Sequence, residues 1–173
     1  FRNNELIRCY HHENSPIQTR VPGEFAYFYI RLDAGMFDND GNYWFINTGS
    51  EVKHNIHIIK PSDLAAIENG ANASWYSMNI HSNGSRVVPI TPGEMFMDMR
   101  NANYKWIPSC RETTGIILLD DNGTPFKSSD DKCIFRSSFV DQNSKVLNPA
   151  AIYSMVQDRL GDIWVGTEAG LFI

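Results

Sequence analysis

The sequence predicts an all-β fold made of repeated antiparallel sheets, and three observations support this prediction. Val, Ile, Phe and Tyr gather in short runs rather than at helical spacing, and 12% of the 173 residues are aromatic. Gly, Asn and Asp interrupt these runs at short intervals, as turn residues do between strands. A tryptophan-bearing element recurs around Trp44, Trp106 and Trp164, which lie 62 and 58 residues apart. Self-similarity at such a long period is typical of a repeat fold.

Turn residues divide the first hundred residues into short predicted strands. An apolar run at 25–32 predicts a strand buried on both faces, and a dense turn signal at 38–42 precedes a second strand at 43–46. Pro61 ends a third strand at 55–60, and residues 63–68 could form one helical turn that Asn69 and Gly70 end. Further strands are predicted at 75–80, 86–90 and 94–99.

The second part of the chain continues in the same way. Asn122 and Gly123 follow a strongly β-forming run, and Asn-Gly between apolar strands is a hairpin signal because both residues tolerate a positive φ. No window has the apolar spacing of a long amphipathic helix. The strands predicted here lie at 104–107, 115–119, 133–140, 151–157, 162–165 and 170–173.

Aligned on their tryptophans, the three copies share a turn before the strand and a polar residue after it. The turn opens with an Asp, which can accept hydrogen bonds from amides two residues on, and closes with Gly or Asn, which adopt a left-handed conformation readily. In the second copy Arg100 stands where the others have Asp, so that copy is degraded. The repeat positions, all interpreted as structural, are Asp38, Gly41, Trp44, Asn103, Trp106, Gly115, Asp158, Gly161, Trp164, Gly166, Thr167 and Gly170.

One meander of four strands cannot bury both of its faces, whereas several packed side by side can. Radial packing of four-stranded sheets makes a β-propeller. We therefore predict that residues 1–173 form one domain, a partial β-propeller of about three blades built from four-stranded antiparallel meanders. Blade-like units span about 24–85 and 86–148, and an incomplete unit spans 149–173. The open sheet edges should seek partners, either the remaining blades of a longer propeller or another copy of the chain.

Charge, hydropathy and cysteine content argue against several classes of protein. The net charge is −5 and no basic run occurs, so nucleic acid is not an expected partner. An apolar run at 25–30 is far shorter than the roughly 20 residues that a membrane-spanning helix needs. Cys9, Cys110 and Cys133 are widely spaced, so we expect mostly buried free thiols rather than a disulfide framework or a zinc site.

Several residues were weighed as chemical sites. Residues 38–41 resemble part of a calcium loop, but Met36 and Asn47 stand where an EF-hand needs an oxygen ligand and a Glu. The spacing of Cys9, His11, His12 and Glu13 matches no zinc pattern. The pair Asp130 and Asp131 is interpreted as turn acids. We predict no metal, no cofactor and no catalytic residue, and we assign no ligand-binding residue.

Residues 157–171, which read QDRLGDIWVGTEAGL, resemble the two-component regulator propeller repeat. That repeat runs from an acid through Gly and Ile-Trp-Val-Gly-Thr to Gly-Leu, and it builds the periplasmic sensor propellers of hybrid histidine kinases. Residues 100–173 also resemble the PorZ-like surface proteins of the type IX secretion system, which carry the same repeats. That second resemblance rests on 105–107, 115–119, 121–124, 130–131 and 148–149.

The resemblance implies a non-catalytic segment of a bacterial envelope protein that binds a ligand or a partner. The parent protein would be the sensor region of a hybrid two-component regulator or a PorZ-like secretion component. It would lie in the periplasm or on the outer surface of a Gram-negative cell, and a sensor would bind a glycan-derived ligand. Two alternatives stay open: a glycan-acting hydrolase or lyase, which needs two carboxylates facing each other across a cleft, and a purely structural scaffold.

Overall fold

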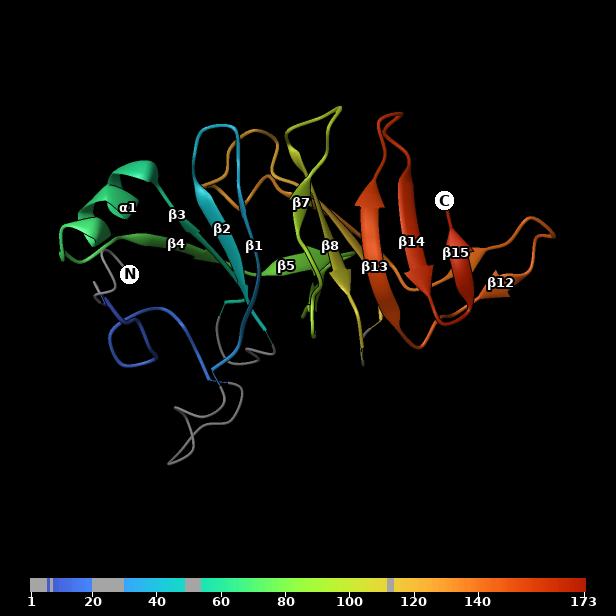
Figure 1. Ribbon diagram of the computed structural model, residues 1–173, viewed down its shortest axis with the longest axis horizontal. Coiled ribbons are helices and arrows are strands. Elements are labelled where there is room, and N and C mark those ends of the chain that lie inside the picture. The colour runs from blue at the N-terminus through green and yellow to red at the C-terminus, as the bar shows by residue number, and fades with distance from the viewer. Residues whose placement is uncertain (1–5, 7, 20–29, 49–53, 112–113) are drawn as a thin grey trace.

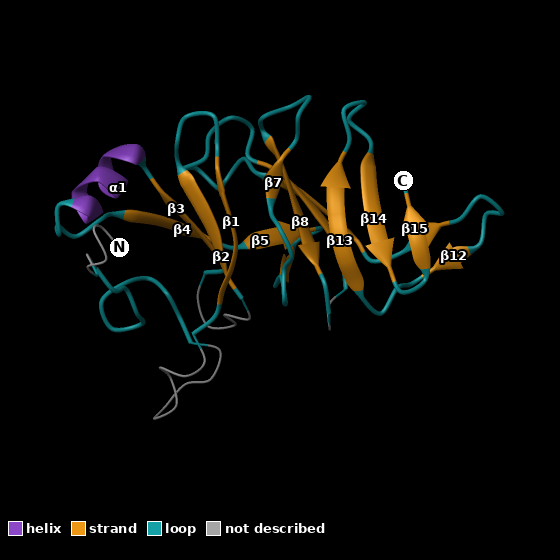
Figure 2. Ribbon diagram, viewed as in Figure 1, coloured by secondary structure: helices purple, strands orange, loops and turns teal. Residues whose placement is uncertain are grey.

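The computed structural model describes residues 6, 8–19, 30–48, 54–111 and 114–173. Three antiparallel sheets stand in a row in chain order, so that each sheet packs its face on the next (Figure 1). Figure 2 shows that strands dominate this part of the chain, with one helix beside the first sheet. This arrangement confirms the predicted all-β fold of packed meanders.

The first sheet has the strand order β1-β2-β3-β4, in which every neighbouring pair is antiparallel. A bulge lies in the first strand between Asp33 and Gly35, where Ala34 has a φ of 47°. The helix α1 connects the third strand to the fourth. The elements are β1 (Leu32–Phe37), β2 (Tyr43–Asn47), β3 (Ile56–Ile59), α1 (Pro61–Glu68) and β4 (Trp75–Met78).

The second sheet repeats this meander, and the third repeats its first three strands. The second sheet comprises β7 (Phe96–Met97), β8 (Tyr104–Ser109), β9 (Gly115–Asp120) and β10 (Lys132–Arg136). The third sheet comprises β13 (Ile152–Gln157), β14 (Ile163–Thr167) and β15 (Gly170–Phe172).

A two-stranded hairpin leads from each sheet to the next, so the repeating unit is larger than one meander. The first hairpin pairs β5 (Ile80–Ser82) with β6 (Ser85–Val87), and the second pairs β11 (Phe139–Val140) with β12 (Val146–Leu147). The loops between the first two strands of all three sheets lie at the same end of the molecule (Figure 1). Equivalent turns are therefore brought to one edge.

Side chains of successive residues point to opposite faces of each sheet, and both faces carry apolar side chains. The first core joins Trp44 and Ile58 of the first sheet to Ile107 and Ile117 of the second. The second core joins Trp106 and Ile116 of the second sheet to residues of the third, among them Ile152, Met155 and Val165. Successive residues of one strand thus serve opposite neighbours, as in a sheet buried on both sides.

Several predicted element boundaries differ from the structure. Residues 33–37 were assigned to no strand, since the predicted strand ended at residue 32, but they belong to β1, which has a bulge between Asp33 and Gly35. The helical turn predicted at 63–68 is an α-helix that begins at Pro61, since proline suits the first helical position. The strand predicted at 133–140 is two strands. Most of the strand predicted at 25–32 lies outside the described residues, and the division into units at 85 and 148 stays a prediction.

Candidate functional site

Two carboxylates at the edge where the turns gather hold the repeat tryptophans in place. Asp38 accepts hydrogen bonds through Oδ1 from the amides of Asp40 and Asn42, and through Oδ2 from the indole of Trp44 at 2.9 Å. Asp158 makes the same set, with the amides of residues 160 and 162 and the indole of Trp164 at 2.9 Å. The bond from Trp164 and those from the backbone hold the pKa of Asp158 below its usual value.

The second copy of the turn has its carboxylate at Asp98, so the prediction that Arg100 replaces it is wrong. Asp98 Oδ2 accepts the indole N–H of Trp106 at 2.8 Å, and Oδ1 accepts the amides of Arg100 and Asn101. This turn is two residues longer than the other two, and an alignment without gaps therefore placed Arg100 opposite Asp38. Burial opposes ionisation of Asp98, but the bonds from Trp106, the turn amides and Gln157 together lower its pKa.

The remaining repeat positions have different structural roles. Gly41 and Gly161 have φ values of 79° and 83°, in the left-handed region that glycine tolerates. Asn103 was predicted to adopt the same conformation, but its φ is not positive. The longer turn closes instead through the amide of Tyr104, which bonds to the carbonyl of Asn101.

Close contacts explain the glycines at 115 and 166, and hydrogen bonds of the Thr167 side chain explain positions 167 and 170. A Cβ at Gly115 would lie 2.5 Å from the ring of Phe135, and one at Gly166 would lie 2.7 Å from the hydroxyl of Ser154. Thr167 donates to the carbonyl of Gly170 at 2.9 Å and accepts the amide of Ala169, which tightens the turn before β15.

All three tryptophans lie on the sheet face that points towards the C-terminal neighbour. Trp44 is 0% exposed beneath the second sheet, and Trp106 packs with residues of the third. On the corresponding face of the third sheet, Trp164 pairs with Val156, and Val156 and Leu171 are 59% and 62% exposed. The third sheet therefore presents, uncovered, the face that its predecessors bury.

Polar contacts cross both junctions between the sheets. Gln157 of the third sheet donates from Nε2 to Asp98 Oδ2 at 2.9 Å and accepts the amide of Met99 at 2.7 Å. At the other junction, Lys105 is buried, ion-paired with Asp121, and lies 5.0 Å from the centre of the Trp44 ring. Sequence reasoning missed Asp98, Gln157 and Lys105 as junction residues, although a gapped alignment on Asp would have found the first.

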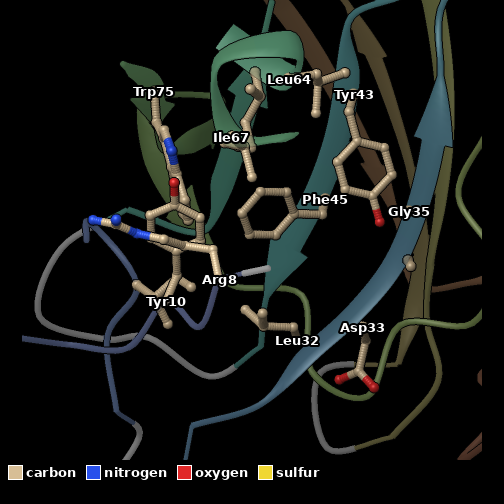
Figure 3. Close-up of a pocket in the computed structure, with 13 residues that line it drawn as sticks. Arg8, Tyr10, Leu32, Asp33, Gly35, Tyr43, Phe45, Leu64, Ile67 and Trp75 are labelled. Carbon is tan, nitrogen blue, oxygen red and sulfur yellow. The ribbon is translucent and has the colours of Figure 1, made fainter. Parts of the chain in front are cut away.

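A pocket of about 500 Å³ lies on the other face of the first sheet (Figure 3). Its walls come from β1, β2, β3, α1, β4 and the N-terminal segment, and they are mainly apolar and aromatic. Leu64 and Ile67 of α1 and Ile17 of the N-terminal segment pack with the same sheet face. The lining residues are Arg8, Tyr10, Ile17, Leu32, Asp33, Ala34, Gly35, Tyr43, Phe45, Ile59, Leu64, Ile67 and Trp75.

No metal-binding cluster of three or more His, Cys, Asp or Glu side chains occurs in the part of the chain that the structure describes. The three cysteines are free thiols but less buried than predicted, since Cys9 is exposed and Cys110 and Cys133 are half-buried. Burial and the charge of His54 lower the pKa of His57 to about 4, and its ring bonds to the Ser77 hydroxyl at 2.8 Å. That histidine is therefore a neutral core residue at physiological pH.

The turn acids of the β9–β10 loop also have partners. Asp130 accepts hydrogen bonds from Thr124 and Lys127. Burial, with the charges of Asp121 and Asp130, raises the pKa of Asp131 to about 6. These contacts fit the interpretation of the pair as turn residues.

One segment of the chain matches a known family model. Residues 146–169, which contain the third Asp–Trp turn, match the family model of the two component regulator propeller. This part of the chain is therefore similar to a two-component regulator propeller repeat. The first and second sheets contain the same Asp–Trp turn as the propeller repeat, which confirms the partial β-propeller that the period predicted.

The whole chain is similar to a solved structure. This is PorZ of Porphyromonas gingivalis, described as an essential bacterial surface component of the type-IX secretion system of this human oral bacterium. The similarity has a TM-score of 0.72 and 26% sequence identity, and it covers 99% of this chain and 21% of PorZ. The chain thus spans about a fifth of the length of the structure that it matches. Comparison with curated proteins gave no match.

Proposed function

We propose that the chain is a non-catalytic propeller segment of a bacterial envelope protein of the PorZ kind, located in the periplasm or on the cell surface. The observation that carries this proposal is the similarity to PorZ, which extends over 99% of the chain. The described residues contain no helix long and apolar enough to cross a membrane. The surface location rests on PorZ and on the propeller repeat alone.

The chemistry of the turns favours a structural role for their carboxylates over a catalytic one. Asp38, Asp98 and Asp158 spend their carboxylate oxygens on backbone amides and on the indoles of their own sheets. Hydrogen bonds hold the pKa values of Asp98 and Asp158 low, which suits permanently charged acceptors rather than proton donors. A glycan hydrolase would need one acid of raised pKa facing a second carboxylate across a cleft. Burial and neighbouring carboxylates raise the pKa of Asp131, but those carboxylates, Asp121 and Asp130, are engaged by lysines of their own sheet and loop.

The outer face of the third sheet is the proposed docking surface for a further propeller sheet. Val156, Trp164 and Leu171 occupy it, and Trp44 and Trp106 show how the same position is covered elsewhere in the chain. Asp158 Oδ2 accepts only the indole of Trp164 among the described residues, whereas Asp98 Oδ2 accepts Trp106 and also Gln157 from the next sheet. Asp158 therefore has an acceptor position free for an equivalent donor.

A further sheet suits this surface better than a second copy of the chain. In a head-to-tail pair of copies, the third sheet of one would have to pack on the outer face of the first sheet of the other. Helix α1 and the segment containing Tyr10 and Ile17 already pack on that face. The covered face of one copy is thus a poor match for the open face of another.

The proposal is tested by deleting the gene in a bacterium that has a type IX secretion system. We expect cargo proteins of that system to stay with the cell, and the intact gene to restore their release into the medium. Normal release after deletion would refute the PorZ-like role.

The propeller repeat at 146–169 favours a second candidate, the sensor region of a hybrid two-component regulator. The same deletion strain separates the two. A sensor predicts unchanged secretion and the loss of a transcriptional response to a glycan, whereas a secretion component predicts unchanged transcription.

A further inference from the structure

The pocket beside the first sheet is closed by the chain itself rather than left for another sheet. Between the first and second sheets, and between the second and third, one strand layer packs directly on another. On the outer face of the first sheet, Leu64 and Ile67 of α1 and the N-terminal Ile17 pack on Phe45 and Ile59 instead. What remains is a pocket of about 500 Å³, a volume that falls in the range of small-molecule sites, roughly 300–1,000 Å³.

The body of this pocket is aromatic. Tyr43 and Phe45 of β2 point into it from one side, and Trp75 and Tyr10 face it from the other (Figure 3). The rings of Phe45 and Trp75 meet edge to face with centroids 5.5 Å apart, and those of Tyr10 and Trp75 at 4.9 Å. Such walls favour a flat or slender apolar group.

The two charged residues that line the pocket are not equivalent. Asp33 is neutralised by Arg31, whose Nε lies 2.8 Å from its carboxylate, and it also accepts the hydroxyl of Thr48. Arg8 donates to the carbonyl of Gly70 and to the amide oxygen of Asn72, and no carboxylate pairs with it among the described residues. Among the described residues, the positive charge of Arg8 thus has no carboxylate to balance it, and Arg8 lies on the side of the pocket away from Asp33 (Figure 3).

A polar atom without a partner lies beside this charge. The hydroxyl of Tyr10 is buried and has no hydrogen-bond partner among the described residues, and Arg8 Cζ lies 5.7 Å from the centre of the Tyr10 ring. A buried hydroxyl without a partner costs free energy, and a ligand that displaced the Tyr10 ring far enough to accept its proton would recover part of that cost. One end of the pocket thus combines a guanidinium with a free donor, next to an aromatic body.

We propose that this pocket binds a small amphiphilic carboxylate, with its apolar body between Tyr43, Phe45 and Trp75 and its carboxylate at Arg8 and the Tyr10 hydroxyl. Arginine suits a carboxylate because its planar fork can donate two parallel hydrogen bonds. The inference does not depend on the parent being a PorZ-like protein, since it uses only contacts within the first sheet, α1 and the N-terminal segment.

The test is isothermal titration of the chain with three probes that share one body: 3-phenylpropionate, 3-phenylpropanol and 3-phenylpropylamine. We expect saturable binding of one phenylpropionate per chain, about tenfold tighter than the alcohol, because a charge-assisted hydrogen bond is worth about one factor of ten or more. The amine should bind most weakly. Equal affinity for all three probes, or no saturable binding, would overturn the proposal.

Two variants and one control locate the site. Arg8→Gln should weaken phenylpropionate about tenfold and leave the alcohol unchanged, while Leu64→Trp should fill the body of the pocket and weaken both. Arg159→Gln removes a cation from the exposed turn of the third sheet and should change neither. An unchanged affinity in Arg8→Gln would contradict the site, as would self-association of the chain in sedimentation velocity that Leu64→Trp abolishes.

Discussion

At the scale of single residues, the repeat depends on one carboxylate that satisfies a turn and a core tryptophan at once. An indole N–H buried without a partner would cost free energy, and Asp38, Asp98 and Asp158 each supply the acceptor. The same turn without a tryptophan occurs in the β11–β12 hairpin, where Asp141 accepts the amides of Asn143 and Lys145. The carboxylate turn is therefore a general device of this chain for reversing direction.

Replacing Asp98 tests whether this residue, rather than Arg100, is the counterpart of Asp38 and Asp158 in the second sheet. Asp98→Ala should lower the free energy of unfolding by about 1–3 kcal/mol, because it leaves the Trp106 indole and two turn amides without their acceptor. Chemical denaturation measures the change. Arg100→Ala is the matched control and should cost clearly less, and a larger loss from Arg100→Ala would restore the gapless alignment.

The pKa of Asp131 is raised, whereas the pKa values of Asp98 and Asp158 are lowered, so Asp131 should affect stability with the opposite dependence on pH. Its folded-state pKa of about 6 lies above the ordinary 3.8, so the folded protein binds the proton more tightly and this residue's contribution to stability falls as pH rises from about 4 to 6. Asp131→Asn should therefore stabilise the protein at pH 7.5 and have little effect at pH 4.

Thermal unfolding of Asp131→Asn at the two pH values measures this difference. Asp130→Asn is the control, because hydrogen bonding from Lys127, which outweighs partial burial, lowers the pKa of Asp130, and its removal should destabilise at pH 7.5. Destabilisation by Asp131→Asn at pH 7.5 would show that the charged form of Asp131 is favoured by folding.

At the scale of elements, the strands after each turn followed from the sequence because apolar runs and turn residues mark both of their ends. The predicted runs at 43–46, 115–119 and 170–173 lie close to β2, β9 and β15. The strand β1 was missed because a bulge lets turn-forming residues occupy a strand. The pocket could not be predicted, since Arg8, Phe45 and Trp75 belong to segments that only the fold brings together.

Gly115 tests how closely two elements of the second sheet approach. Gly115→Ala would place a Cβ 2.6 Å from the carbonyl oxygen of Arg136, which is backbone and cannot rotate away. We expect a loss of roughly 1–3 kcal/mol in chemical denaturation, as for overpacking of a filled site. Ser137→Ala, at an exposed position just beyond β10, should be neutral, and a neutral Gly115→Ala would show that β9 and β10 pair differently.

At the scale of the whole molecule, the three sheets follow one another in the same orientation, and each turns its tryptophan towards the next. This direction explains why Trp44 is fully buried, and why exposed apolar residues gather around Trp164 on the last sheet. It also explains the asymmetry of the two ends: α1 and the N-terminal segment cover one end, and the other presents an open apolar face. The two proposals of function use these two ends separately.

The stacking direction is tested most directly by ¹⁹F NMR of the chain labelled with 5-fluorotryptophan, in the presence of a soluble paramagnetic agent. Single Trp→Phe variants assign the four signals. The agent should leave the Trp44 signal sharp and broaden the Trp164 signal, because the second sheet covers Trp44 whereas the face around Trp164 is open. Equal broadening of Trp44 and Trp164 would contradict the ordered stacking of the sheets.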